Sequence, residues 1–244
     1  MFDPVRTARH PRTEEGGPIN PTPSILVFDV NETLLAIDSL APLFGDVFGD
    51  RRVLREWFNQ LVLYSMTATL SEHYVDFFTL GPSVLRMLGA IHDVTVTDDD
   101  IERLREGFRT MPPHPDVVDG LNRLRDDGLR LVSLTNSPHR PGTPTPLENA
   151  GLADFFEQQF SVDASHAFKP APVVYRHACQ ELGVSPTDCM MVAAHHWDLL
   201  GARNAGFGTA LITRPGNAPV GALPQPDIIA KDLAELAARL RRDG

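Results

Sequence analysis

The sequence lacks the features that would fix a protein to a membrane, a nucleic acid or an oxidising compartment. None of its apolar runs approaches the roughly 18–20 residues that a membrane helix needs. Acidic residues outnumber basic ones by 32 to 22, and the net charge of −10 disfavours nucleic-acid and anionic-membrane surfaces, which need clustered Lys and Arg. The two cysteines, Cys179 and Cys189, are too few and too close in sequence to staple the fold, which favours a reduced compartment. We therefore expect a cytoplasmic protein without nucleic-acid or membrane partners.

The first 24 residues differ in composition from the rest of the chain. They contain many prolines, a Gly-Gly pair and few apolar side chains. No apolar segment of the kind found in a secretory signal is present among them. Too little of this stretch can be buried to offset the entropy lost on ordering, so residues 1–24 are predicted to form a mobile tail.

The apolar pattern changes twice beyond the tail. The continuous apolar run Ile25–Phe28 is typical of a strand buried on both faces. From about residue 34 to 109, apolar residues recur at three- and four-residue spacing, which predicts helices, one of them capped by Thr97. Prolines at 112, 113 and 115 end this block. Short apolar runs then alternate with helical patterns, which indicates repeated βα units.

These patterns predict an α/β protein whose core is a Rossmann-like open parallel sheet with helices on both faces. The helical block lies inside the first crossover and forms a cap, residues 38–111, inserted into a core of residues 25–37 and 112–244. Hinges near 36–40 and 111–115 would let the cap close over the core and exclude water. Further strands are expected over 129–134, 159–162, 189–193, 209–212 and 228–229, and core helices over 117–125, 147–156, 173–182, 199–205 and 233–240.

Polar residues gather where four of the predicted strands end. In an open parallel sheet, function collects at the carboxyl ends of the strands. A carboxylate beside a cation has a lowered pKa and stays ionised, as a nucleophile requires. Because parallel strands end at the same edge of the sheet, we expect carboxylates, a lysine and several hydroxyl and amide groups to meet there. The residues that follow the four strands are Asp29, Asn31 and Thr33; Thr135, Asn136 and Ser137; Lys169 and Pro170; and His195, His196, Trp197 and Asp198.

In order, spacing and position, these four segments resemble the motifs of the haloacid dehalogenase superfamily. The motifs read FDVNETLL at 28–35, LTNS at 134–137, Lys169-Pro170 with Tyr175 six residues on, and Trp197-Asp198 before Gly201. The resemblance covers residues 25–240 and is greatest to the type II (S)-2-haloacid dehalogenases. It implies the haloacid dehalogenase fold and hydrolysis of the carbon–halogen bond of a small 2-haloacid. It also implies a homodimer, although nothing in the sequence identifies an interface.

The resemblance assigns a role to each motif residue. Asp29 would be the nucleophile that forms an ester, which water then hydrolyses, and Thr33 would hold its carboxylate. Lys169 would keep Asp29 ionised, and Asp198 would pair with Lys169 and orient the hydrolytic water. Tyr175 would lie near the substrate. Taken singly, Asp29 and Asp198 also suit turn and helix caps, and Tyr175 suits a packed core position.

The residues that would bind the substrate also separate two reaction classes. Thr135 and Asn136 would donate hydrogen bonds to the substrate carboxylate or to Asp29, unless they only form a turn. Asn31 stands where phosphatases of the superfamily place a second Asp as general acid. Phosphatases also hold Mg²⁺ with carboxylates near the last motif, where this chain offers only Asp198. A halide leaving group needs neither a proton nor a metal, so we expect no cofactor and no metal site.

Two departures from the dehalogenase pattern concern the cap and the last motif. The arginine that helps the halide leave falls at Phe58, which carries no charge. The serine and asparagine of the last motif become Ala193 and His195, so water positioning passes to His195 and Asp198. His195 could act as a base near neutral pH, or pack at the strand end. Trp57 and Phe58 would either line an apolar pocket over the nucleophile or fill the cap core.

Three hypotheses therefore stand. The first is a metal-independent dehalogenase acting on a short halogenated carboxylic acid. The second is a Mg²⁺-dependent phosphatase of small phosphomonoesters, against which Asn31 argues. The third, which Phe58 and Ala193 support, is a protein of the same fold that binds a ligand without turnover, because a fold does not fix a function.

Overall fold

The computed structural model describes residues 23–241, so the predicted tail lies outside the described residues except for its end. Ser24, which we counted with the tail, lies just before the first strand and makes two backbone hydrogen bonds beside it. Its N–H donates to the carbonyl of Asp188, and its own carbonyl accepts from the N–H of Arg130, each over 3.0 Å. These contacts concern a single residue at the expected boundary, and the extent of the tail stays a prediction.

A sheet of six parallel strands forms the centre of the molecule, in the order β3-β2-β1-β4-β5-β6. The central strand β1 (Ile25–Phe28) is wholly buried, as its continuous apolar run predicts. Strand order reverses direction between β1 and β4, and such a switch point opens a crevice at the carboxyl ends of the strands. The other strands are β2 (Arg130–Thr135), β3 (Gln158–Ser161), β4 (Cys189–Ala193), β5 (Gly208–Ile212) and β6 (Ile228–Ala230).

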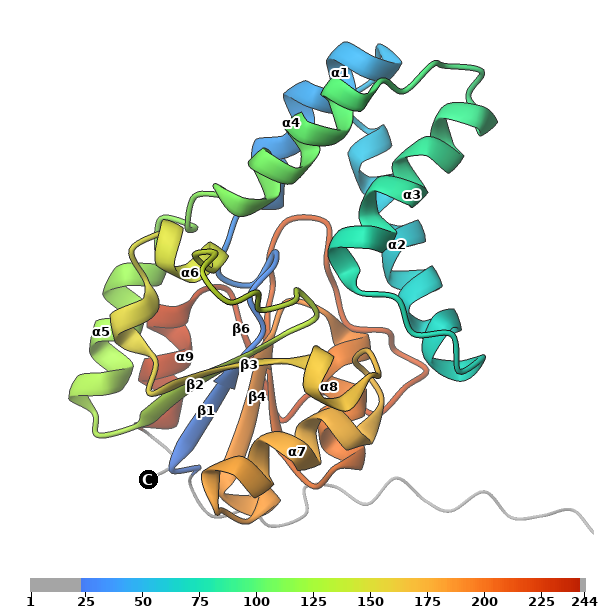
Figure 1. Ribbon diagram of the computed structural model, residues 1–244. Coiled ribbons are helices and arrows are strands. Elements are labelled where there is room, and N and C mark those ends of the chain that lie inside the picture. The colour runs from blue at the N-terminus through green and yellow to red at the C-terminus, as the bar shows by residue number, and fades with distance from the viewer. Residues whose placement is uncertain (1–22, 242–244) are drawn as a thin grey trace, which may run out of the picture.

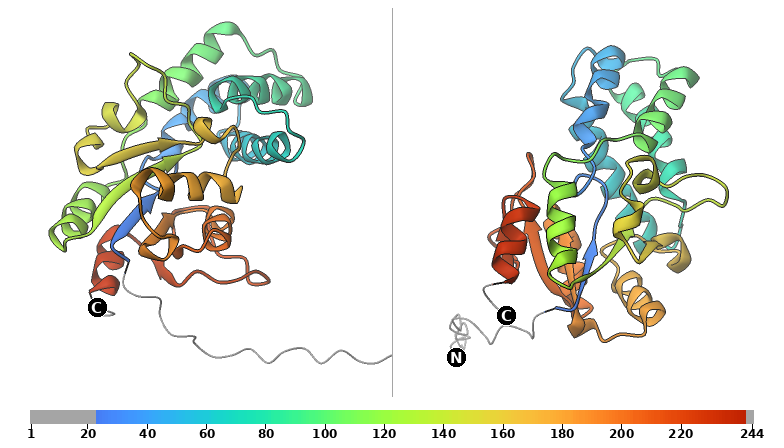
Figure 2. Two further views of the ribbon diagram at one scale, coloured as in Figure 1. Left: turned by 60° about the horizontal axis from the view of Figure 1, so that its bottom comes forward. Right: turned by 90° about the vertical axis from the view of Figure 1, so that its left-hand side faces the viewer.

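Helices cover both faces of this sheet (Figures 1 and 2). On one face α5 (Val117–Asp126) packs against α9 (Leu233–Leu240), and on the other α7 (Pro172–Leu182) packs against α8 (His196–Asn204). The predicted Rossmann-like core with a helical insertion is therefore confirmed.

The helical block lies beyond the carboxyl ends of the strands (Figure 1); we call residues 38–111 the cap. The chain enters and leaves the cap through adjacent segments, because Leu35 and Pro113 form an antiparallel bridge. The N–H of Ala36 also donates to the carbonyl of Pro112 over 2.8 Å. After a 3₁₀ turn at Ile37–Leu40, the cap helices are α1 (Ala41–Phe48), α2 (Val53–Leu70), α3 (Phe77–Ile91) and α4 (Asp98–Arg109).

One expected core helix is broken in the structure. The pattern over 147–156 predicts a continuous helix, but α6 covers only Pro146–Asn149, and a separate 3₁₀ turn covers Ala153–Phe155. Gly151 between them has a φ of 69°, which ends an α-helix. Within residues 23–241 no helix is long and apolar enough to cross a membrane, and Cys179 and Cys189 are free and buried.

The contact between α5 and α9 requires a glycine at position 120. A Cβ there would lie 2.3 Å from the Cβ of Leu233, closer than packed atoms allow. Alanine is favoured in helices by about 1 kcal/mol, but overpacking costs about 1–3 kcal/mol. We therefore expect Gly120→Ala to lower the free energy of unfolding by up to about 2 kcal/mol in urea titrations. Gly221→Ala, where a Cβ meets open space, should change it by less than about 0.5 kcal/mol.

Candidate active site

The centre of the site is the buried ammonium group of Lys169, beyond the end of β3. Each of its three N–H groups has an acceptor: Asp29 Oδ1 and Asp198 Oδ2, both at 2.7 Å, and the carbonyl of Leu134 at 2.9 Å. Burial alone would lower the pKa of Lys169, but the carboxylates of Asp198 and Asp29 raise it above its ordinary value. The lysine is therefore a fixed cation whose position is set by strand β2 and by the segments that follow β1 and β4.

Asp29 follows β1 and is 4% exposed. While Oδ1 accepts from Lys169, Oδ2 accepts from the hydroxyl of Thr33 over 2.7 Å, and that hydroxyl accepts from the N–H of Ala194. Burial alone would raise the pKa of Asp29, but Lys169 and His195 hold it well below its ordinary value. The carboxylate is thus ionised and oriented, as a nucleophile must be.

Asp198 does not cap a helix, contrary to the alternative that its sequence position allows. The helix begins at His196, so Asp198 lies in its first turn with its side chain turned inward. Its Oδ1 accepts from the hydroxyl of Tyr175 over 2.5 Å, while Oδ2 accepts from Lys169. Burial raises the pKa of Asp198, against the lowering effect of Lys169.

Tyr175, on α7, holds the carboxylate of Asp198 by the hydrogen bond from its hydroxyl. It is fully buried, and its hydroxyl also lies within 3.0 Å of the carbonyl of Asp198. Burial and the charge of Asp198 raise its pKa well above the ordinary value. A Cβ at Gly201 would come within 2.7 Å of the hydroxyl, so α8 can approach only because position 201 is glycine. The structure therefore places Tyr175 against Asp198 rather than at a surface open to substrate.

His195 lies on the other side of Asp29. Its Nδ1 is 3.3 Å from Asp29 Oδ2, and its Nε2 is 2.7 Å from Glu32 Oε2. The ring packs between those of Phe58, with centroids 5.7 Å apart, and Trp197, with centroids 5.0 Å apart. Burial alone would lower the pKa of His195, but the carboxylates of Asp29 and Glu32 raise it to about 9. With a pKa near 9 the imidazole is protonated at neutral pH in the resting site. Of the two alternatives for His195, the packed strand-end position describes this resting ring, and a role as base stays a prediction.

Glu32 and Arg55 belong to the site but were absent from the sequence prediction. Glu32 is 3% exposed and has a φ of 64°, which costs a non-glycine residue about 1–2 kcal/mol. Its Oε1 accepts from the guanidinium of Arg55, on cap helix α2. Burial alone would raise the pKa of Glu32, but His195 and Arg55 lower it. A glutamate in a polar turn gave no signal of this role, because its partner His195 is 163 residues away.

The loop after β2 brings three of the predicted polar residues to the same edge. Asn136 Oδ1 accepts from the N–H of Lys169 over 3.1 Å, and Thr135 Oγ1 accepts from the N–H of Ser137. Asn31 Nδ2 donates to Ser137 Oγ over 3.2 Å, whereas Asn31 Oδ1 has no partner within the described chain. All four side chains are buried, and we call this group the floor of the site.

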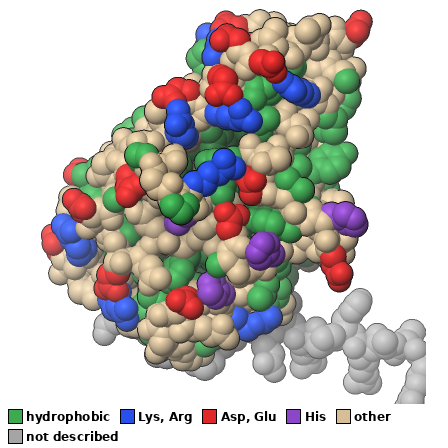
Figure 3. Space-filling model, viewed as in Figure 1, with side chains coloured by type: hydrophobic (Ala, Val, Ile, Leu, Met, Phe, Trp, Pro, Cys, Tyr) green, Lys and Arg blue, Asp and Glu red, His purple; other side chains and the backbone are tan. Residues whose placement is uncertain are grey.

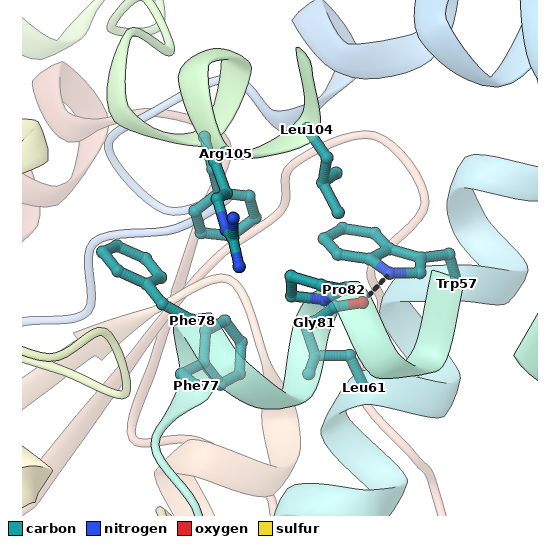
Figure 4. Close-up of a pocket in the computed structure, with 9 residues that line it drawn as sticks. Trp57, Leu61, Phe77, Phe78, Gly81, Pro82, Leu104 and Arg105 are labelled. Atoms are coloured by element: carbon teal, nitrogen blue, oxygen red, sulfur yellow. Dashed lines mark hydrogen bonds between the residues drawn. The ribbon is translucent and has the colours of Figure 1, made fainter. Parts of the chain in front are cut away.

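The two cap aromatics point in different directions. Phe58 packs on His195, as described, whereas Trp57 lies in the cap interior (Figure 4). The indole N–H of Trp57 donates to the carbonyl of Gly81 over 2.9 Å, and its ring centroid lies 5.5 Å from that of Phe44. The alternative of a cap-core role thus describes Trp57, and the expectation that it lines the pocket over Asp29 is wrong. Adjacent helical residues diverge by about 100°, which lets the two buried rings meet different neighbours.

A cleft of about 440 Å³ separates the cap from the loop after β2. It lies between α3 and α4 on one side and residues 138–146 on the other, and three arginines line it. Each of these arginines, Arg105, Arg109 and Arg140, also pairs with an acid. Basic and acidic side chains are interspersed on the face that Figure 3 shows, without a large patch of one sign.

The donor set does not suit the Mg²⁺ that phosphatases of this superfamily hold at the same sheet edge. Both carboxylate oxygens of Asp198 already accept hydrogen bonds from Lys169 and Tyr175. Ala193 and Ala194 supply no side-chain oxygen, although Mg²⁺ prefers oxygen ligands. Between residues 23 and 241, no three His, Cys, Asp or Glu side chains are grouped so that they could hold a metal ion.

The chain matches a known protein family over the region that contains the four strand-end segments. The family model of haloacid dehalogenase-like hydrolases matches residues 23–206, three quarters of the chain. The chain therefore belongs to the haloacid dehalogenase-like hydrolases.

Curated relatives and solved structures narrow the comparison within this family. The chain is 29% identical to "(S)-2-haloacid dehalogenase 4A" of Burkholderia cepacia, over 79% of this chain and 84% of the relative. It is 30% identical to "(S)-2-haloacid dehalogenase 1" of Pseudomonas sp. strain CBS-3, over 77% of this chain and 83% of the relative. The crystal structure of an L-2-haloacid dehalogenase superposes with a TM-score of 0.81 at 28% identity, covering 91% of this chain and all of that one.

The charge on His195 should make stability depend on pH. Its pKa is about 9 in the folded protein and 6.5 ordinarily, so its stabilising contribution is complete below pH 6.5. That contribution is lost as pH rises through 9, by an amount on the order of 3 kcal/mol. We expect the unfolding free energy of the unaltered protein to fall by about that much more than that of His195→Gln between pH 6.5 and 9.5. Urea titrations that run parallel for both proteins would contradict the assignment.

Proposed function

We propose that this protein hydrolyses the carbon–halogen bond of a short 2-haloacid through an ester on Asp29. The observation that carries the proposal is the ionised carboxylate of Asp29, held by Lys169 on one oxygen and Thr33 on the other. The chain matches relatives named (S)-2-haloacid dehalogenases over most of their length, and their names agree with this chemistry.

In the first step, a carboxylate oxygen of Asp29 attacks the carbon that bears the halogen, and the halide leaves. Lys169 and His195 both contact Asp29 and hold it ionised until attack. The halide departs on the far side of the attacked carbon, away from the nucleophile. His195 therefore does not stand where an arginine would meet the leaving halide, and Phe58 supplies no charge there.

In the second step, water hydrolyses the ester. Ester formation removes the negative charge of Asp29, one of the two charges that raise the pKa of His195. The imidazolium of His195 then loses its proton to solvent. Together with the halide of the first step, this proton makes up the acid that the overall reaction releases. Nδ1 becomes a base beside the ester carbonyl, within the 3.3 Å that separates it from Asp29 Oδ2 in the resting site. The base expected at His195 is thus produced by the first step.

The substrate carboxylate needs hydrogen-bond donors at the floor of the site. A half-turn of the Asn31 amide lets the hydroxyl of Ser137 donate to Oδ1, which otherwise has no partner in residues 23–241. The Nδ2 group then faces the site with free N–H bonds. Asn31 therefore replaces the acid of a phosphatase with a donor that suits a carboxylate.

The nucleophile assignment is tested by replacing Asp29. Asp29→Asn should lower halide release from 2-chloropropionate and fluoroacetate, with EDTA present, by a factor on the order of 10⁴ or more. The matched control is Asp154→Asn, an exposed carboxylate on a surface turn, which should release halide at the unaltered rate. Halide electrodes and ion chromatography measure both.

Isotope labelling supplies a separate check on the intermediate. In a single turnover with excess protein in ¹⁸O water, the new hydroxyl oxygen should come from Asp29 and carry no label. A labelled product in the first turnover would mean that water attacks the substrate directly, and would overturn the ester mechanism.

A further inference from the structure

Glu32 stands at a turn position that favours glycine. Its φ of 64° lies in the left-handed region, which is strained for any residue with a side chain. Its carboxylate is nevertheless buried and fully used: Oε2 meets His195 Nε2 at 2.7 Å, and Oε1 accepts from Arg55. The carbonyl of Glu32 also accepts from the ring of His114 over 2.9 Å. A strained residue held by three distant partners is typical of a functional site.

The contact with Glu32 decides which nitrogen of His195 faces the nucleophile. Nε2–H donates to Glu32, so Nδ1 is the nitrogen left beside Asp29. Nδ1 has no well-formed hydrogen bond to any residue that the structure describes. The rings of Phe58 and Trp197 fix the plane of the imidazole, so that its lone pair cannot turn away once the proton is lost.

We propose that Glu32 is a positioning residue for His195 in the hydrolysis of the Asp29 ester, a role that rests on the proposed function. As the water oxygen bonds to the ester carbonyl carbon, one water proton passes to Nδ1. The bond from that carbon to the substrate-bearing oxygen then breaks, and this oxygen takes the proton to become the hydroxyl of the product. The proton left on the Asp29 carboxyl passes to Nδ1, which restores the carboxylate and the imidazolium.

The charges around His195 predict what the loss of Glu32 would do. The carboxylates of Asp29 and Glu32 face the ring of His195 directly. Lys169 pairs with Asp29, and Arg55 pairs with Glu32. Glu32→Gln keeps an acceptor for Nε2–H but removes one of two negative charges. The pKa of His195 should therefore fall by about one unit or more. The ester should form at a rate within about threefold of normal and be hydrolysed about ten to a hundred times more slowly, part of what a positioned base contributes.

The experiment uses the full chain, with Glu32→Gln, Glu32→Gly and, as matched control, Glu181→Gln at an exposed position. Glycine adopts a positive φ without strain, so Glu32→Gly keeps the turn intact if a buried amide disturbs it. Imidazole NMR titration gives the pKa of His195, assigned with His195→Gln. Rapid quenching with 2-chloropropionate and mass spectrometry gives the lifetime of the Asp29 adduct. Support requires a lower pKa and a longer-lived adduct in both Glu32 variants, with the control unchanged.

The outcomes separate this role from the proposed function. An adduct that decays as fast in both Glu32 variants as in the unaltered protein would overturn the role of Glu32 alone. A long-lived adduct with an unchanged His195 titration would also overturn it, because the delay would then have another cause. No adduct and no halide from the unaltered protein would overturn the proposed function itself, whatever the titration gave.

Discussion

The buried ammonium group of Lys169 is the interaction on which the rest of the site depends. Its three N–H bonds end on Asp29, Asp198 and the carbonyl of Leu134, so one atom links strand β2 to the segments that follow β1 and β4. A buried charge is tolerated only when it is paired and fully hydrogen-bonded, and Lys169 meets both conditions. Loss of one partner would leave the others as uncompensated buried charges. The nucleophile is therefore oriented by the same contacts that allow the fold to hold a lysine inside.

Charges of alternating sign continue outward from this lysine. Asp198, Lys169, Asp29, His195, Glu32 and Arg55 form a row from the sheet to the cap, in which each acid lies beside a base. Alternation offsets the desolvation cost of each buried member, because every charge attracts an opposite neighbour. It also links the members: a change of charge at Asp29 is felt at His195. One charged row can thus hold a nucleophile ionised and later yield a base.

The sequence could predict those parts of the site that are local or lie at strand ends. Asp29, Thr33 and Lys169 follow buried strands, and parallel strands bring their carboxyl ends to one edge, so the contacts among them were expected. The pairing of Glu32 with His195 was not, because it depends on a left-handed turn and on the direction of a ring far along the chain. Trp57 and Phe58 show the same limit, since an aromatic pattern does not say which neighbour faces the sheet. The pairing of Asp198 with Lys169 was expected, but its place in the first turn of α8 rather than at the helix cap was not, because helix boundaries are the least certain part of a sequence prediction.

Arg55 links the cap to the core by an ion pair with Glu32. It is one-third exposed, sits on α2 and reaches the buried carboxylate of Glu32 across the cap–core boundary. If the cap swung away, it would carry this cation with it and leave the charge of Glu32 without its second partner, which would tighten the hold of Glu32 on the proton of His195. A closed cap loosens that hold. The acidity of the imidazole would thus report the position of a helix, and chemistry that needs the free base would run only while the cleft is shut.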